Sequence, residues 1–90
     1  MSKKIFISGK IRNCEDFEQK FENAENTIRK KFPDAIIVNP VKGKFMDMRH
    51  CIQELLLCDS IALINNWCFS ENAKLEFKIA EALKLKVIFI

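Results

Sequence analysis

Four short apolar runs alternate with three segments of helical periodicity along the chain. The runs are predicted to be strands and occupy residues 4–8, 35–38, 60–64 and 87–90. Between them, apolar residues recur at spacings of three and four, which is typical of helices with one buried face. The three helices are expected from an N-cap at Asn13 to Pro33, from about Met48 to Cys58-Asp59, and from an N-cap at Ser70 to about Leu85.

Strands that are apolar throughout and separated by helices indicate an α/β fold with a parallel sheet covered on both faces. Right-handed crossovers favour the strand order 2-1-3-4, with the first helix on one face and the other two on the opposite face. Residues 1–90 are expected to form a single domain. Since one helix cannot cover four strands, we expect a homodimer or larger homo-oligomer to bury the remaining apolar surface.

Composition excludes several classes of protein. Hydrophobic residues make up 49% of the chain and charged residues 30%, as in a folded globular domain. The longest uncharged run, 60–70, is too short to span a bilayer. The net charge of +3 is scattered and the chain has no Tyr, which argues against a nucleic-acid surface. The opening Met1-Ser2-Lys3-Lys4 does not lead into a signal peptide, so we expect a cytoplasmic protein.

The cysteine pattern gives no indication of a metal site. Cysteines stand at positions 14, 51, 58 and 68 without a C-x-x-C pair, and His50 is the single histidine. Structural zinc requires four ligands at short, paired spacings, so neither a metal nor another cofactor is expected. The thiols are expected to be reduced, with Cys51 and Cys58 in the core.

One carboxylate lies among apolar residues on the third predicted helix. A step of about 100° per residue places Glu76 near the middle of an apolar arc that includes Leu75 and Leu83 and is expected to be buried. A buried, unpaired carboxylate is costly, so it is normally paired, protonated or functional. Two interpretations stay open: Glu76 pairs with Lys10, Arg12 or a neighbouring subunit, or it is a nucleophile or general base in a site that excludes water.

Parallel sheets of this kind bind ligands beyond the carboxyl ends of their strands, where the strand order reverses. Here that point lies between the first and third strands, so loops 8–12 and 65–70 are expected to meet there. Lys10 and Arg12 either neutralise a phosphate or are solvated at the surface. Trp67 either stacks on a base or anchors an interface or the core.

An ordered set of fragments spans nearly the whole chain and resembles a known family. The fragments are Ile5-Phe6-Ile7-Ser8-Gly9, Val38-Asn39-Pro40, Met48-Arg49, residues 57–64 and residues 67–76. With these residues in this order, the chain resembles the family DUF4406, which is related to the nucleoside 2-deoxyribosyltransferase-like superfamily. The resemblance implies a flavodoxin-like, Rossmannoid three-layer sandwich with a nucleoside or nucleotide site at the strand ends.

The resemblance also implies roles for individual residues. Glu76 matches the covalent nucleophile of the deoxyribosyltransferases, and Ser70, at a helix N-terminus, matches the position where related nucleotide N-glycosidases hold a phosphate. The remaining substrate-binding residues would be Ser8, Gly9, Lys10, Arg12, Asn65, Asn66 and Trp67. Gly9 would let the backbone approach the ligand, and Asn65 or Asn66 would hydrogen-bond ribose or base.

The chain departs from the family pattern at several positions. Asn66 and Asn72 stand where glycine is usual, the first-loop Tyr of the transferases is absent, and Asn65 and Asn66 replace an aspartate expected near the end of the third strand. Three hypotheses therefore stay open. They are cleavage of an N-glycosidic bond through Glu76, a nucleotide-binding module without turnover, and an oligomeric interaction protein in which Glu76 is an interfacial ion pair.

Overall fold

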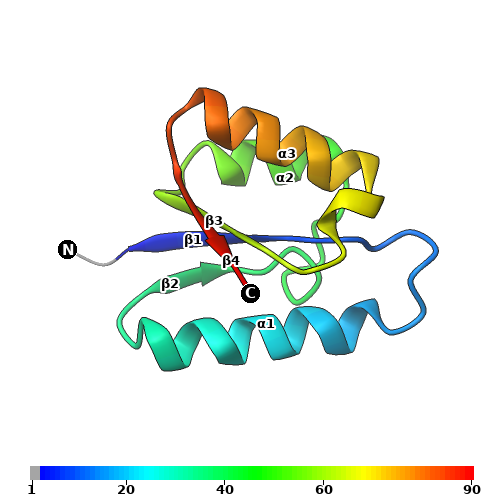
Figure 1. The fold of residues 1–90 in the computed structure, drawn as a ribbon, viewed down its shortest axis with the longest axis horizontal. Coiled ribbons are helices and arrows are strands. Elements are labelled where there is room, and N and C mark those ends of the chain that lie inside the picture. Colours follow the sequence, from blue (N-terminus) through cyan, green and yellow to red (C-terminus); the bar gives the residue numbers. More distant parts are fainter. Residues whose placement is uncertain (1–2) are drawn as a thin grey trace.

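Four parallel strands form the middle layer of the molecule (Figure 1). The computed structural model describes residues 3–90. Met1 and Ser2, the start of the segment that is not expected to be a signal peptide, lie outside the described residues. The strands are β1 (Lys4–Ser8), β2 (Ile36–Val38), β3 (Ser60–Leu63) and β4 (Lys86–Phe89). Their order is β2-β1-β3-β4, which confirms the predicted topology.

Three α-helices cover the two faces of this sheet, as predicted. They are α1 (Phe17–Lys31), α2 (Met48–Leu55) and α3 (Glu71–Ala82), and a short 3-10 helix, η1 (Trp67–Phe69), precedes α3. Figure 1 shows α1 alone on one face, with α2 and α3 side by side on the other. The fold is therefore an α/β three-layer sandwich. Within residues 3–90, no helix is long and apolar enough to cross a membrane.

The alternation of side chains along the strands divides the core into two halves. Ile5 and Ile7 of β1 pack with α1, whereas Phe6 between them packs with α2 and α3. Ser8 follows the same alternation and points to the side of α2 and α3. The two buried cysteines, Cys51 and Cys58, lie in this second half, as the sequence predicts.

The predicted start of the first helix is wrong. Asn13 has a φ of 59° and belongs to a turn, and α1 begins only at Phe17 after Asp16. A backbone in the left-handed region does not have the extended conformation of an N-cap. At the third helix the predicted cap is confirmed, because Ser70 Oγ accepts a hydrogen bond from the Ala73 backbone N–H at 3.1 Å.

The other helix ends lie earlier than the sequence pattern indicates. The second helix ends at Leu55 rather than near Cys58-Asp59, and the third ends at Ala82 rather than near Leu85. After α3, the chain turns through Lys84, which has a φ of 61°. Cys58 after α2 and Leu85 after α3 pack against the core from turns, so the periodic pattern continues beyond the helix itself.

Several large apolar side chains remain exposed on the single chain. Phe69, Phe89 and Leu57 are each more than 60% exposed, and Leu75 and Leu83, both expected on the buried arc of the third helix, are about half exposed at 45% and 46%. The apolar arc of the third helix is therefore wider than the surface that this chain covers.

Candidate functional site

A cleft of about 500 Å³ opens at the carboxyl ends of the strands, at the switch point between β1 and β3. Its walls come from the loop after β1, from the loop between β2 and α2, and from the first two turns of α3. The residues that line it are Ile7, Gly9, Lys10, Ile11, Arg12, Asn13, Phe21, Pro40, Met46, Met48, Cys51, Phe69, Ser70, Glu71, Asn72 and Glu76. The predicted location of a ligand site therefore coincides with the cleft that the fold forms.

Glu76 is the buried carboxylate of this cleft. It is 6% exposed, and Ser8 Oγ donates a hydrogen bond of 2.7 Å to Glu76 Oε1. Within residues 3–90, no cation lies within 4 Å of its carboxylate, so the interpretation in which Glu76 pairs with Lys10 or Arg12 of its own chain is wrong. The partner of Glu76 is a neutral hydroxyl, and the cost of burying the charge is only partly offset.

The surroundings of Glu76 favour its protonated form. Burial raises the pKa of Glu76 to about 7, and the Ser8 hydroxyl and, less strongly, the Cys51 thiol oppose this rise. Cys51 directs its S–H to the Phe45 carbonyl at 3.2 Å. Burial and the Glu76 charge together raise the pKa of Cys51 to about 12, so this thiol stays protonated. Glu76 is thus an acid that changes charge near neutral pH.

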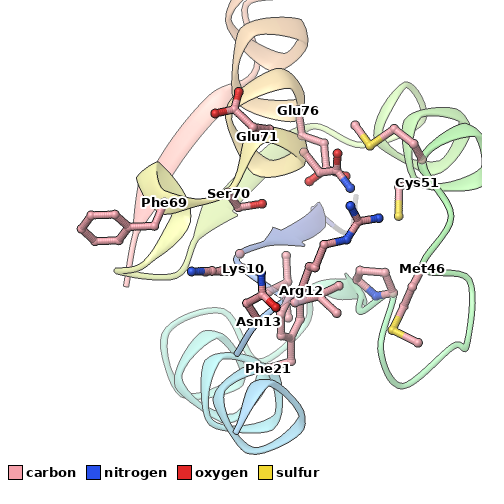
Figure 2. A pocket seen from close by; sticks show the side chains of 16 residues that line it. Lys10, Arg12, Asn13, Phe21, Met46, Cys51, Phe69, Ser70, Glu71 and Glu76 are labelled. Atoms are coloured by element: carbon pink, nitrogen blue, oxygen red, sulfur yellow. The ribbon is translucent and has the colours of Figure 1, made fainter. Parts of the chain in front are cut away.

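Lys10 and Arg12 come from the loop after β1. Figure 2 shows the Arg12 side chain extending into the cleft towards the space between α3 and the loop that carries Met46, whereas Phe69 points away from it. Within the described part of the chain, neither cation has a carboxylate within 4 Å. The cleft therefore presents two uncompensated positive charges opposite the buried acid.

The N-terminus of α3 forms the wall opposite this loop. The Ser70 hydroxyl already accepts from the Ala73 N–H, so its oxygen stabilises the helix. The backbone N–H groups of the first turn carry the positive end of the helix dipole and are directed towards the cleft end of α3. Lys10, Arg12 and this helix end are three features that favour a negatively charged ligand group.

Four of the predicted binding residues do not line the cleft. Ser8 lies behind it, in contact with Glu76. Trp67 packs against Phe77, with 4.9 Å between ring centroids, and adjoins the core. Asn66 Oδ1 accepts from the Lys10 backbone N–H at 3.1 Å, so this amide holds the first loop in place. Asn65 lines a smaller cavity of about 200 Å³ beside α1.

Gly9 lines the cleft and is required there for packing. A Cβ atom at this position would lie 2.8 Å from Ile64 Cδ1 and 2.9 Å from Ile64 Cβ, closer than side chains approach one another. The absent side chain therefore makes room for Ile64 at the end of the neighbouring strand. The close approach of the Gly9 backbone to a ligand, which the family resemblance implies, stays a prediction; the close approach in the structure is to the Ile64 side chain.

A second buried carboxylate is that of Glu25, whose burial the sequence pattern does not indicate. It is 6% exposed on α1 and accepts hydrogen bonds from Arg29, at 2.9 Å and 3.1 Å, and from Asn39 Nδ2 at 3.1 Å, with Lys42 Nζ at 3.4 Å. Burial raises the pKa of Glu25, but the Arg29 and Asn39 hydrogen bonds and the Lys42 charge outweigh burial and hold the pKa below its ordinary value. Glu25 ties α1 to the turn that leads into one wall of the cleft.

That wall consists of residues for which the sequence gives only weak signals. Pro40, Met46 and Met48 contribute apolar surface from the loop after β2 and the start of α2, and Phe21 does so from α1. Only the position of this loop in the chain indicates that it forms part of the site, because a loop that follows a strand next to the switch point borders the ligand site. Apolar walls with a few polar groups are typical of small-molecule sites.

The titratable side chains do not form a metal site in residues 3–90, where no group of three or more His, Cys, Asp or Glu residues is arranged to hold an ion. The four cysteines are free, and Cys14 and Cys68 lie outside the core. The chemistry available at the cleft is therefore that of one buried acid, two cations, a hydroxyl and several amides.

The fold and cleft define an α/β protein with a small-molecule site at the carboxyl end of a parallel sheet. Residues 3–89 match the family described as "Domain of unknown function (DUF4406)", and the chain belongs to this family. No curated protein and no solved structure matches the chain significantly. The family is thus assigned, whereas the activity has to be argued from the cleft.

Proposed function

We propose that the protein binds a nucleoside or nucleotide in the cleft and cleaves its N-glycosidic bond, with Glu76 as nucleophile. The observation that carries this proposal is a buried carboxylate, hydrogen-bonded through one oxygen, at the base of a cleft of about 500 Å³. This volume suits a nucleoside or nucleotide. The resemblance to nucleoside 2-deoxyribosyltransferases supports the same role for Glu76.

In the proposed reaction, a Glu76 carboxylate oxygen attacks the anomeric carbon of the sugar. The bond from that carbon to the base breaks, its electron pair passes to the base nitrogen, and the base leaves with a proton from solvent. Water then attacks the sugar–Glu76 ester, which frees the sugar and regenerates the carboxylate. The sequence of steps is that of a retaining glycosidase with one covalent intermediate.

The positive groups at the cleft support a nucleotide over a nucleoside as its ligand. Lys10 and Arg12 lie on one side and the N-terminus of α3, which begins after Ser70, on the other. Phosphate binds well to guanidinium groups and to helix N-termini. A 5′-monophosphate would place its charge among these groups and its sugar towards Glu76.

A second candidate is a nucleotide-binding module without turnover. The observation in its favour is the pKa of Glu76, about 7, because an acid that is half protonated at neutral pH can donate a hydrogen bond to a base as well as accept one. The third hypothesis, an interfacial ion pair, loses support because Glu76 is only 6% exposed within a single chain.

We also propose a homodimer or larger homo-oligomer in the cytoplasm. The exposed apolar side chains, among them Phe89 at 66% and Leu75 at 45%, support this assembly, because a second copy of the chain would cover such surface.

Chromatographic detection of free base tests the catalytic proposal. The protein is incubated with ribo- and deoxyribonucleosides and their 5′-monophosphates, alongside Glu76→Ala and the control Glu81→Ala. Glu81 lies on the same helix, but it is exposed and does not line the cleft.

Base release by the protein and by Glu81→Ala, but not by Glu76→Ala, is the expected result. Release that survives Glu76→Ala would contradict the assigned nucleophile. No release from any substrate, together with a rise in melting temperature on adding a nucleotide, would favour the binding module.

A further inference from the structure

The buried contact between β1 and α3 involves one of the two carboxylate oxygens of Glu76, so the two oxygens have different surroundings. Ser8 Oγ lies 2.7 Å from Oε1, and both residues are almost fully buried, at 1% and 6% exposed. Ser8 is the last residue of β1, where it pairs with Leu63 of β3, and its carbonyl accepts a hydrogen bond from the Ile64 N–H at 2.9 Å, so the neighbouring strand fixes its position. A hydroxyl held in this way fixes the orientation of the carboxylate that it contacts.

We propose that Ser8 is a positioning residue for Glu76, holding Oε1 in place so that Oε2 is the oxygen that meets the ligand. The inference rests on the proposed function for the identity of the ligand. The contact itself lies within the chain and is present without a ligand.

The other polar groups around Glu76 do not hold its carboxylate in the same way. From α2, Cys51 directs its S–H to the Phe45 carbonyl at 3.2 Å. From the loop after β1, Lys10 and Arg12 line the cleft without an ion pair to Glu76, and on α3 itself Glu71 is paired with Lys74. Within residues 3–90, Ser8 thus donates the short hydrogen bond to the buried acid, and the Cys51 thiol makes a weaker contribution.

A hydrogen bond donated to a carboxylate is stronger when the carboxylate is charged. Ser8 therefore favours the anionic form that a nucleophile requires, and it opposes the rise in the pKa of Glu76 that burial causes. Without the hydroxyl, the acid would ionise only at a higher pH. Positioning and ionisation are thus consequences of one contact.

The sheet also offers a matched control. Among residues 3–90, Ser60 is the other buried serine of a strand, 1% exposed on β3, and its Oγ has no hydrogen-bond partner there. Ser60→Ala removes a buried strand hydroxyl without removing a contact to Glu76. Differences between Ser8→Ala and Ser60→Ala therefore report the contact rather than the loss of a hydroxyl.

The test is an NMR titration of the Glu76 side-chain carboxyl carbon in the protein without ligand. Ser8→Ala is expected to raise the titration midpoint by about one pH unit, the size expected for a lost charge-assisted hydrogen bond. Ser60→Ala is expected to leave the midpoint in place. Ser8→Cys retains a weaker donor, so its titration midpoint is expected to lie between those of the parent and Ser8→Ala. If Ser8→Ala does not fold, the midpoint of Ser8→Cys tests the proposal instead.

A midpoint unchanged by Ser8→Ala, or shifted equally by Ser60→Ala, would overturn the proposal. If the protein releases base, a one-unit shift predicts about a fivefold lower kcat for Ser8→Ala at pH 7, with the deficit from ionisation lost by about pH 9. If no base is released, the glycosidase proposal fails, while the ligand-free titration still decides whether Ser8 controls Glu76.

Discussion

Replacing Glu76 with glutamine is expected to stabilise the fold at alkaline pH. The carboxyl has a pKa of about 7 in the folded chain against an ordinary value of 4.5, so folding favours its protonated form. Its contribution to stability is complete below the lower value and is lost as pH rises through the higher one. Glutamine carries no charge and can still accept from Ser8, so it avoids this loss.

The size of the effect follows from the two pKa values. Each pKa unit corresponds to about 1.4 kcal/mol, so a rise from 4.5 to about 7 costs about 3 kcal/mol once Glu76 is fully ionised. The free energy of unfolding of Glu76→Gln should exceed that of the parent by about this amount at pH 8.5. Near pH 4.5 the difference should be close to zero.

Urea unfolding between pH 4.5 and 8.5 measures this difference. Trp67 is the only tryptophan, and it packs against Phe77 at the edge of the core, so its fluorescence reports unfolding. Groups away from Glu76 titrate equally in both proteins and cancel in the comparison, and the neighbouring Cys51 thiol, whose pKa is raised to about 12, stays protonated in the folded chain over this range. A difference that does not vary with pH, or a variant less stable than the parent at pH 8.5, would refute the reasoning.

Three further substitutions test other parts of the structure. Glu25→Gln should destabilise the fold by about 1–3 kcal/mol at neutral pH, because it weakens charge-assisted hydrogen bonds. Since the pKa of Glu25 is lowered, this loss of stability, measured by urea unfolding, should become smaller as pH falls below 4.5. A loss that does not depend on pH would contradict this reasoning. Gly9→Ala should cost about 1–3 kcal/mol in the same assay through its clash with Ile64, and an unchanged stability would show that Ile64 can move aside. Phe89→Lys should reduce the mass measured by sedimentation if the exposed β4 edge contributes to the proposed oligomer, and an unchanged mass would place the interface elsewhere.

The arrangement of the sheet could be predicted because it depends on local patterns and a handedness rule. Each strand is apolar along its length, and each crossover contains one helix, so the order β2-β1-β3-β4 follows with few alternatives. The buried position of Glu76 could be predicted for a similar reason, since helical periodicity alone places it between Ala73 and Ala80, which are both buried.

Features that depend on loops could not be predicted in this way. Asn13 resembles an N-cap, yet its backbone is left-handed, which no periodic pattern indicates. Trp67 follows a strand at the switch point, but η1 directs its ring to Phe77 rather than to the cleft. The burial of Glu25 depends on contact with Asn39, a residue from a different element, so its own helix gives no sign of it.

The place of β1 in the sheet has a consequence for how the chain folds. Of the four strands of this sheet, β1 is the first to be synthesised, yet it lies in the interior of the sheet, where Phe6 pairs with Val38 on one side and with Ile61 on the other. Such distant pairings form slowly, and until they form, the apolar residues of β1 remain open to aggregation. The contact between Ser8 and Glu76 must wait longer still, until α3 has docked. A chain interrupted before α3 would therefore lack both the packing on one face of its central strand and the acid of its cleft.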